Sequence, residues 1–379
     1  MFLRADLNVP LEGAAVSDDL RIEASLPTIR VLRERGAAVI VASHLGRPKG
    51  KPSDELRLEP VRNLLQELAG FEVHPLRGPV GEDAKRAAHD LGSGDVGMLE
   101  NLRFDPGEEA NDPAFSAALA SLADAYVGDA FGAAHRSHAS VVGVAERLPA
   151  AAGNLMEREI GVLSKLIHEP DAPFVAILGG AKVSDKLGVI DALLERVDGL
   201  LVGGAMAFTF LAAQGADVGG SLVEEDRLDD VRRSLKRADE RGIPIILPED
   251  VVTAPEISAD APTQTVAADH IPAGSKGLDI GPRTVEEFAR VLSDARTVFW
   301  NGPMGVFELE PFANGTRGVA QAVAGADAFS VVGGGDSIAA IRRLGFEDRI
   351  DHLSTGGGAS LEFLEGRTLP GIAVLQEDR

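Results

Sequence analysis

Residues Phe329–Ser337 read FSVVGGGDS, and this stretch decides the fold class. The short run FSVV is typical of a buried strand, and the three glycines after it are typical of a tight turn. Glycine lets a backbone approach a ligand closely, and a helix that begins at Ser337 would direct free N–H groups and its positive dipole end toward a phosphate. The stretch therefore predicts a strand–turn–helix unit with an anion site at the turn.

Similar units extend in both directions from this stretch. Short aliphatic runs alternate with amphipathic segments such as Asp54–Ala69 and Asp229–Arg241, which indicates βα units on mostly parallel sheets. Apolar runs without polar alternation favour strands that are covered on both faces. The expected strands are Ala37–Ser43, Val96–Leu99, Ala125–Asp129, Phe174–Leu178, Gly199–Val202, Ile243–Leu247, Val298–Trp300, Phe329–Val332 and Leu353–Ser354.

The length of the chain indicates two domains, because 379 residues are too many for one ordinary core. Ala150–Pro173 is the expected connection, since Gly153 to Ile167 is helical in pattern and Pro170 ends it. Each of the two similar-sized domains should hold a mostly parallel sheet flanked by helices, as in Rossmann-like folds. We expect an N-terminal domain, an interdomain helix, a C-terminal domain and a tail that packs back on the first domain, over residues 1–152, 153–170, 171–361 and about 362–379.

The composition excludes several classes of protein. Hydrophobic residues make up 45% of the chain, enough for substantial cores, yet no apolar run approaches the roughly 18 residues of a membrane span. The formal net charge of −22 argues against nucleic acid as a partner. The chain contains no cysteine, which excludes disulfides and thiolate metal sites and fits a cytoplasmic location.

Polar and charged side chains in the first half gather at expected strand ends and turns. Arginine presents a planar fork that grips carboxylate or phosphate oxygens, so several arginines at the turns of an acidic protein predict a small, strongly anionic ligand. The alternative for any single arginine is an ion pair with a neighbouring carboxylate at the surface. The candidate residues are Asp6, Asn8, Arg21, His44, Arg47, Arg103 and Arg136.

The second half lacks both the Walker A pattern and the G-x-G-x-x-G fingerprint, which disfavours a P-loop NTPase and a standard dinucleotide dehydrogenase. Its glycine turns predict a phosphate cradle instead. Lys182 and Lys186 are four residues apart in GGAKVSDK and are expected on one helical face, where they would supply positive charge. The alternative is a solvated helix face with Asp185 as partner. Asp336 is a candidate ligand for Mg²⁺, which prefers one or two carboxylates together with phosphate oxygens and water.

Two further turns carry weaker signals. NGPMGVFE, Asn301–Glu308, offers the Glu308 carboxylate to ribose hydroxyls, and a core or capping role for Asn301 and Glu308 is nearly as good an interpretation. TGGGAS, Thr355–Ser360, repeats the glycine turn and is otherwise only a tight turn. Each motif alone is weak, but together in one α/β unit they favour a phosphate cradle.

A series of segments, in this order, resembles the phosphoglycerate kinase family. They are RADLNVP, SHLGRP, LENLRF, DAFGAAHRSH, LGGAKVSDK, GGAMAFTFL, GLDIGP, WNGPMGVFE, VVGGGDS and STGGGASLEFLEG, and they extend from residue 4 to about residue 366. The combination is highly specific for this family. The resemblance implies an enzyme, a phosphotransferase with a carboxyl group as acceptor, that transfers a phosphoryl group reversibly from 1,3-bisphosphoglycerate to Mg-ADP and yields 3-phosphoglycerate and Mg-ATP.

The resemblance also implies a role for each candidate residue. The 3-phosphoglycerate site corresponds to Asp6, Asn8, Arg21, His44, Arg47, Arg103 and Arg136. The nucleotide site corresponds to Gly179, Lys182, Lys186, Gly203, Gly281, Asn301, Glu308, Gly333, Gly334, Gly335, Asp336 and Ser337. Arg21 and Lys182 would be the catalytic residues that stabilise the transferring group, and Asp336 would bind magnesium with Asp185 as an assistant.

The implied chemistry requires positioning more than covalent catalysis, so no enzyme nucleophile is expected. The acid and the nucleotide would bind different domains, and domain closure would align them for direct in-line transfer while excluding water. We expect hinge bending at Ala150–Pro173 and near Thr355–Ser360. The resemblance further implies a cytoplasmic monomer that works in glycolysis or gluconeogenesis, with these small molecules as its partners.

The sequence departs from the family pattern at three places. Only three residues precede RADLNVP, Ala205 stands where a third glycine is common, and Asn154 stands where an aromatic residue is frequent. The short start motivates one alternative, a non-catalytic scaffold or nucleotide-binding protein of this fold, which the intact Lys182 and Asp336 disfavour. A second alternative is an α/β kinase for a different phosphorylated acid, and a substrate panel distinguishes it.

Overall fold

The chain forms two units, each built on a six-stranded parallel sheet. The structure is a computed structural model that describes residues 1–13 and 15–376. Unit 1 comprises Met1–Gly161 and the described residues from Thr368 onward, and unit 2 comprises Val162–Arg367. The boundary falls inside helix α6 (Asn154–His168). The expected fold class, two α/β domains with parallel sheets flanked by helices, is confirmed.

The strands of unit 1 lie in the order β5-β6-β4-β1-β7-β8, and all neighbours are parallel. They are β1 (Phe2–Arg4), β4 (Val39–Ala42), β5 (Val73–Leu76), β6 (Val96–Leu99), β7 (Tyr126–Gly128) and β8 (Ala150–Ala152), with a hairpin of β2 (Leu11–Glu12) and β3 (Ala15–Val16). The helices are α1 (Leu20–Glu34), α2 (Glu59–Ala69), α3 (Glu82–His89), α4 (Pro106–Ala110), α5 (Pro113–Ala120) and α14 (Pro370–Gln376).

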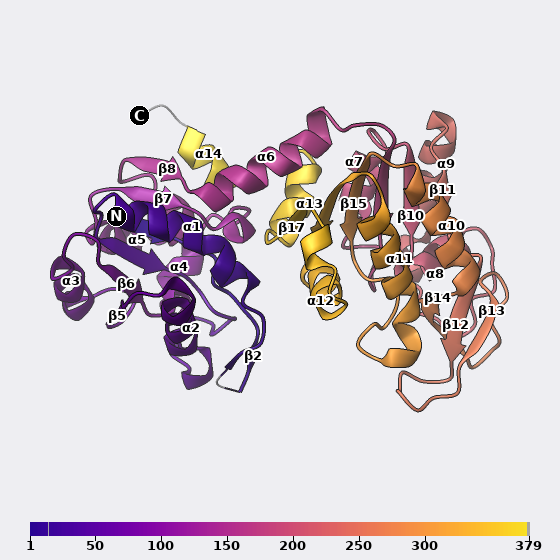
Figure 1. The fold of residues 1–379 in the computed structure, drawn as a ribbon, viewed down its shortest axis with the longest axis horizontal. Helices are drawn as coiled ribbons and strands as arrows, with labels where there is room; N and C mark the ends of the chain where they lie inside the picture. Colours follow the sequence, from indigo (N-terminus) through magenta and orange to yellow (C-terminus); the bar gives the residue numbers. More distant parts are fainter. Residues whose placement is uncertain (14, 377–379) are drawn as a thin grey trace. The chain divides into compact units, whose positions relative to one another are not determined.

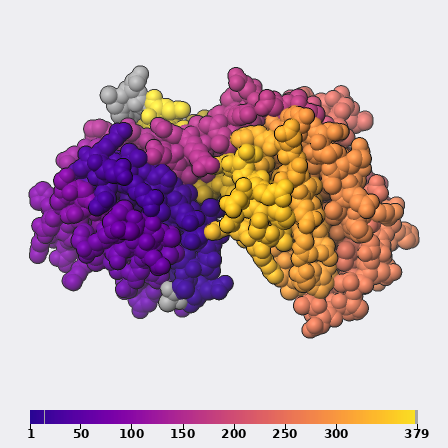
Figure 2. Space-filling view, in the orientation of Figure 1, coloured from indigo at the N-terminus to yellow at the C-terminus, as the bar shows by residue number. Residues whose placement is uncertain are grey.

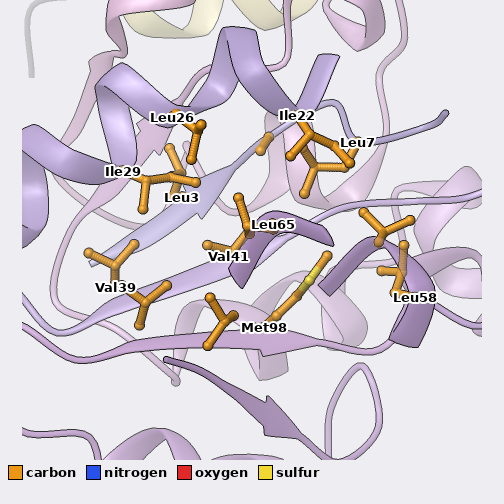
Figure 3. Packing of buried hydrophobic residues seen from close by; sticks show 14 of the residues in the cluster. Leu3, Leu7, Ile22, Leu26, Ile29, Val39, Val41, Leu58, Leu65 and Met98 are labelled. Carbon is orange, nitrogen blue, oxygen red and sulfur yellow. The ribbon is translucent and has the colours of Figure 1, made fainter. Parts of the chain in front are cut away.

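Apolar side chains of unit 1 form cores on both faces of the sheet. On β1, Leu3 belongs to one buried cluster and Phe2 to the other, because successive side chains of a strand point to opposite faces. Leu3 packs with Ile22 of α1 and Leu65 of α2 (Figure 3), whereas Phe2 packs with Phe115 of α5. This double coverage explains why the strands lack polar alternation.

The main sheet of unit 2 has the order β11-β10-β9-β15-β16-β17, again with all neighbours parallel. Its strands are β9 (Phe174–Leu178), β10 (Gly199–Val202), β11 (Ile245–Ile246), β15 (Thr297–Asn301), β16 (Phe329–Gly333) and β17 (His352–Ser354). The helices are α7 (Leu187–Leu193), α8 (Met206–Ala213), α9 (Leu228–Arg241), α10 (Pro282–Ser293), α11 (Asn314–Gly325), α12 (Gly335–Arg343) and α13 (Gly358–Leu364).

Both sheets are wound in two directions from a central pair of strands. In unit 2 the chain moves outward from β9 to β10 and β11, and later outward from β15 to β16 and β17. Right-handed crossovers in opposite directions place their helices on opposite faces. Accordingly α8 contacts α9, whereas α10 lies beside α11 (Figure 1). The order reverses between β9 and β15 in unit 2 and between β1 and β7 in unit 1, which are the positions where such sheets bind ligands.

Every expected strand is present, but β1, β5 and the β2–β3 hairpin were not among the expected strands, and four further features differ from the sequence predictions. The expected connection Ala150–Pro173 begins with strand β8, which pairs with β7; its three alanines carry little strand preference. The strands β12 (Asp250–Ala254), β13 (Gln264–Ala267) and β14 (Lys276–Ile280) form an antiparallel sheet that was not predicted. Helix α12 begins at Gly335 and not at Ser337. Unit 2 continues to Arg367, beyond the expected end at residue 361.

The end of the described chain supports unit 1. Helix α14 packs on β8 and on the π-helical turn Ala139–Gly143, and part of it reaches the surface (Figure 2). The N–H of Gly371 donates to the carbonyl oxygen of Ala134 at 2.8 Å, which fixes the loop after β7. Among the described residues no helix has the length and apolar character to cross a membrane.

Asp129 provides a test of how unit 1 holds the start of α6. Its Oδ1 accepts hydrogen bonds from the N–H groups of Leu155 at 2.9 Å and Met156 at 3.1 Å. Asp129→Ala should lower the free energy of unfolding of unit 1 by about 1–2 kcal/mol, because two N–H groups at the helix start lose their acceptor. Urea denaturation followed by circular dichroism measures this. Glu157→Gln, at an exposed position of the same turn, is the control, and equal stabilities for the two variants would contradict the capping role.

Candidate functional site

The predicted anion-binding residues of unit 1 lie where four strands of its sheet end. Asp6 and Asn8 follow β1, His44 and Arg47 follow β4, Arg103 lies in the 3₁₀ turn after β6, and Arg136 follows β7. Arg21 reaches the same region from the first turn of α1. Because these strands are parallel neighbours, their carboxyl ends share one edge of the sheet.

Direct contacts join four of these residues through one turn. Arg21 Nη1 lies 3.0 Å from Asp6 Oδ2 and donates to the carbonyl oxygen of Asn8 at 3.1 Å. Asn8 Oδ1 accepts a hydrogen bond from the N–H of Gly46 at 2.8 Å, and Arg103 Nη1 donates to the Gly46 carbonyl oxygen at 2.7 Å. The Gly46 turn thus ties the ends of β1, β4 and β6 together.

Two arginines beside this turn, Arg47 and Arg103, place positive charge at the ends of the strands. Arg47 directly follows Gly46, is exposed, and makes no hydrogen bond or ion pair with any residue that the structure describes. Burial lowers the pKa of Arg103, the carboxylate of Glu109 opposes this, and the positive charge of Arg136 lowers the pKa further. Arg103 Nε lies 3.2 Å from Glu109 Oε1, close enough for an ion pair but not aligned for a hydrogen bond. A bound anion would offset the electrostatic repulsion between Arg103 and Arg136.

His44 is buried and faces a cation. Its Nδ1 lies 3.1 Å from Arg4 Nη2 and 4.0 Å from Asp6 Oδ1. Burial lowers the pKa of His44 well below its usual value, and the charges of Arg4, Arg103 and Arg21 lower it further. Since a guanidinium can only donate, Nδ1 is the acceptor and the proton of the neutral ring sits on Nε2. His44 therefore offers a neutral N–H donor.

Sequence reasoning missed the buried polar network behind this site. Arg4, only 1% exposed, donates from Nε to Ser140 Oγ at 2.7 Å, and Ser140 Oγ donates to Glu108 Oε1 at 2.6 Å. Glu108 is fully buried and also accepts from the N–H of Ser140 at 3.0 Å. The one available signal was an arginine inside the strand FLR, since a lone charge in a buried strand requires a partner.

In unit 2 a cavity of about 330 Å³ lies where β9, β15 and β16 end. Residues 180–182, 185–186, 301–303 and 334–337 line it. It brings together seven of the predicted nucleotide-site residues, which are Lys182, Lys186, Asn301, Gly334, Gly335, Asp336 and Ser337. The cavity sits at the switch point between β9 and β15, as expected for a doubly wound sheet.

The two lysines do not share a helical face, so that prediction is wrong. Helix α7 begins only at Leu187, and residues 182–186 form an irregular turn. Lys182 is exposed and makes no hydrogen bond or ion pair with a described residue. Lys186 is buried; its Nζ donates to the Asn301 carbonyl oxygen at 3.1 Å and contacts the side-chain oxygen. Burial lowers the pKa of Lys186 to about 8, against the opposing charges of Asp185 and Asp336.

Glycines allow the loops around the cavity to touch. Gly302 has φ of +99°, and a Cβ on it would lie 2.2 Å from the carbonyl oxygen of Gly179. Gly334 has φ of +90°, and its Cβ would lie 3.0 Å from the Asn301 amide. Side chains at either position would separate the loops. Ser337 Oγ also accepts a hydrogen bond from the Gly302 N–H at 2.6 Å, joining α12 to the β15 loop.

The remaining predicted nucleotide residues lie outside the lining of this cavity. Gly179 stands behind it, with its N–H bonded to the Asn301 carbonyl oxygen at 3.0 Å. A Cβ on Gly203 would lie 2.4 Å from Met304 Sδ and 3.6 Å from Ile280, next to Gly281 in the chain. Gly333 ends β16, and Glu308 is exposed.

The first turn of α12 has the chemistry of an anion site. Its leading N–H groups have no acceptor within the helix, and the dipole is positive at this end. Asp336 lies in the same turn and lines the cavity. In the described part of the chain no three His, Cys, Asp or Glu side chains could hold a metal together. Asp336 therefore fits Mg²⁺ only with phosphate oxygens and water as the other ligands.

Two other cavities are larger than the cavity at the ends of β9, β15 and β16, so cavity volume alone does not identify the candidate site. A cavity of about 730 Å³ in unit 1 lies between Arg57 and Phe104, and one of about 700 Å³ in unit 2 lies between Asp171 and Asp351. The first adjoins the ends of β5, an edge strand, and its neighbour β6, away from the reversal of strand order. The second adjoins the amino ends of β9, β15 and β16, whereas sheets of this kind bind ligands at the carboxyl ends of their strands.

The neutral state of His44 can be checked in solution. Around neutral pH its ring should stay neutral with the proton on Nε2, because burial and the facing guanidinium of Arg4 lower its pKa and disfavour the imidazolium. Long-range ¹H–¹⁵N NMR spectra report the tautomer and the charge. His44→Gln assigns the signal, and titration of that signal between pH 6 and 7 would refute the arrangement.

Comparison of the sequence with known proteins identifies the family of the chain. The sequence model of the family described as "Phosphoglycerate kinase" matches residues 1–367. The chain is 59% identical to a phosphoglycerate kinase of Rubrobacter xylanophilus over 377 residues, covering 100% of this chain and 95% of that protein. It is 56% identical to that of Moorella thermoacetica, covering 100% and 96%.

Solved structures give the same result. The fold matches the crystal structure of phosphoglycerate kinase from Pyrococcus horikoshii with a TM-score of 0.88 at 38% identity, covering 99% of this chain and 95% of that one. It matches that of Coxiella burnetii with a TM-score of 0.86 at 41% identity, with the same coverage. The chain belongs to the phosphoglycerate kinase family.

Proposed function

We propose that the chain catalyses reversible phosphoryl transfer from 1,3-bisphosphoglycerate to Mg-ADP, with the acid bound by unit 1 and the nucleotide bound by unit 2. Family membership makes the chain an enzyme of this type. The observation that supports the division of labour is that each unit carries an exposed cation at the carboxyl ends of its parallel strands that makes no hydrogen bond or ion pair with a described residue. This cation is Arg47 after β4 in unit 1 and Lys182 after β9 in unit 2.

In unit 1 the acid is the ligand that best suits the side chains. A phosphorylated three-carbon acid carries negative charge at both ends, which matches arginines at the ends of several strands. His44 would donate from Nε2 to an oxygen of this ligand, and Asp6 would hold Arg21 in place through the 3.0 Å ion pair. The full proposed acid site is Asp6, Asn8, Arg21, His44, Arg47, Arg103 and Arg136.

In unit 2 the cavity would receive the nucleotide phosphates. The start of α12 would bind them through N–H groups, and Asp336 would bind the magnesium ion of the substrate Mg-ADP with Asp185 nearby. Gly203 and Gly281 would contribute through their backbone, because Met304 and Asp250 already fill the space beside them, and Glu308 would accept hydrogen bonds from ribose hydroxyls. The full proposed nucleotide site is Gly179, Lys182, Lys186, Gly203, Gly281, Asn301, Glu308, Gly333, Gly334, Gly335, Asp336 and Ser337.

Catalysis would rest on positioning and charge. The carboxylate of the acid and the terminal phosphate of the nucleotide are the reacting groups, so no side chain needs to form a covalent intermediate. Lys182 and Arg21 would stabilise the charge of the transferring phosphoryl group. Because the substrates bind to different units, we propose that closure about Ala150–Pro173 and Thr355–Ser360 brings them in line and excludes water. We further propose that the enzyme acts as a cytoplasmic monomer.

The decisive assay is ADP formation from Mg-ATP with and without 3-phosphoglycerate. Activity should require the acid, and Lys182→Ala should lower turnover by roughly 10²–10³-fold with a smaller loss of nucleotide affinity, because its charge matters most in the transition state. Lys236→Ala, an exposed lysine on α9, is the control and should be unchanged. ATP hydrolysis independent of the acid, or near-normal turnover of Lys182→Ala, would contradict the proposal.

The two-site assignment has its own test. Arg47→Ala should raise KM for 3-phosphoglycerate about tenfold or more and change KM for Mg-ATP little, since its exposed guanidinium belongs to unit 1. Initial-rate kinetics with each substrate varied in turn give both values. Equal increases in the two constants would argue against separate sites. A panel of other phosphorylated acids, run with the unmodified enzyme, tests the alternative of a different acid substrate.

A further inference from the structure

A carboxylate from a distant part of the chain anchors the loop that carries Lys182. Glu224 precedes the 3₁₀ turn Glu225–Arg227, forty residues after Ser184. Its Oε2 accepts from the N–H of Ser184 at 3.0 Å, and its Oε1 accepts from Ser184 Oγ at 2.6 Å. Its own N–H donates to Thr209 Oγ1 at 3.2 Å, and Thr209 is buried on α8. The Glu224 backbone is therefore fixed on a packed helix.

The loop between β9 and α7 has other restraints on either side of Lys182. Before the lysine, the N–H of Met206 donates to the carbonyl oxygen of Gly180 at 3.0 Å. After it, the side chain of Val183 is fully buried, and its carbonyl oxygen accepts from the N–H of Lys186 at 2.9 Å. Helix α7 does not begin until Leu187, so no helical ladder fixes residues 182–184. Lys182 is exposed, and the Glu224 contact is one of the anchors that directly follow it.

The negative charge of Glu224 strengthens its hydrogen bonds with Ser184. Burial acts to raise the pKa of Glu224, but hydrogen bonds from the Ser184 side chain and backbone and from the Val183 backbone outweigh it, and the charge of Lys182 adds to them, so the pKa is lowered. The carboxylate therefore stays ionised at neutral pH and its oxygens are occupied by loop donors. Lys182 remains close to a negative charge without being bound in an ion pair.

We propose that Glu224 is a positioning residue for the phosphoryl-transfer reaction, which holds the backbone at residues 183 and 184 so that Lys182 points its ammonium group into the phosphate cavity. The inference rests on the proposed role of Lys182. A catalytic cation that shifts by an ångström loses much of its effect on the transition state, because electrostatic stabilisation depends on preorganised distance. Glu224 would thereby affect turnover without touching either substrate.

Glu224→Gln tests this with little change in volume. A carboxamide replaces one of the two accepting oxygens by an NH₂ group and removes the negative charge, so the N–H and the Oγ of Ser184 can no longer each donate to a charged oxygen. We expect kcat to fall about tenfold, with KM for 3-phosphoglycerate unchanged and urea stability close to that of the parent enzyme. Ser184→Ala removes only the Oγ bond and should give a smaller fall. Glu225→Gln, the exposed neighbouring acid, is the matched control and should be normal.

A double-mutant cycle tests whether Glu224 affects kcat through Lys182. In a Lys182→Ala background, Glu224→Gln should lower kcat no further, because the positioned group is gone. A further tenfold fall, or an unchanged kcat in Glu224→Gln alone, would overturn the proposal.

Hydrogen–deuterium exchange of residues 181–186 provides a readout independent of activity. It should quicken in Glu224→Gln and not in Glu225→Gln, and unchanged exchange would also overturn the inference. Failure of the enzyme to use 3-phosphoglycerate would instead reject the proposed function, while the exchange result still decides whether Glu224 holds the loop.

Discussion

The reversal of strand order at the centre of each sheet is the constraint on which the rest of the structure depends. Right-handed crossovers leave β9 and β15 in opposite directions, so the helices after these strands cover opposite faces and cannot fill the space above their carboxyl ends. The backbone N–H and carbonyl groups of the loops there must therefore find hydrogen-bond partners within the loops. In unit 2 they do so against each other, as where the N–H of Gly180 donates to the Pro303 carbonyl oxygen at 2.9 Å. In unit 1 the Gly46 turn follows β4, the neighbour of β1, and contacts Asn8 and Arg103.

Buried charge follows from this arrangement. Cations held at a strand end are partly removed from water, and each needs compensation from within the unit. Unit 1 provides it through Ser140, which links the buried Arg4 to Glu108 over 2.7 and 2.6 Å. Unit 2 provides it through carbonyl and amide oxygens of Asn301 around Lys186. The compensation is thus polar for Arg4 and Lys186, whereas Arg21 and Arg103 are compensated by direct ion pairs with Asp6 and Glu109.

The sequence was sufficient to predict nine of the twelve strands of the parallel sheets and most residues at their ends, because continuous apolar runs followed by glycine or arginine have few other interpretations. The short strands β1, β5 and β8 were not among the expected strands. The antiparallel sheet β12–β14 escaped notice since Gln264–Ala267 is largely exposed and carries no apolar run. The pairing of Arg4 with Glu108 depends on residues more than a hundred positions apart, which no local pattern encodes. Lys182 and Lys186 were misplaced for a related reason. Their spacing fits a helix, but hydrogen bonds to the remote Glu224 hold the segment as a turn.

Cations without an internal partner are useful indicators of an anion-binding site in this acidic chain. With 59 acidic residues against 37 basic ones, carboxylates are abundant, and a cation without a partner must be kept from them by structure. Two acids at these sites already have partners: Asp6 is paired with Arg21, and Glu224 is hydrogen-bonded by Ser184. Arg47 and Lys182 make no hydrogen bond or ion pair with a described residue, although Asp185 and Asp336 line the same cavity as Lys182. Internal contacts that occupy carboxylates thus leave exposed cations for which an anionic ligand is a suitable partner.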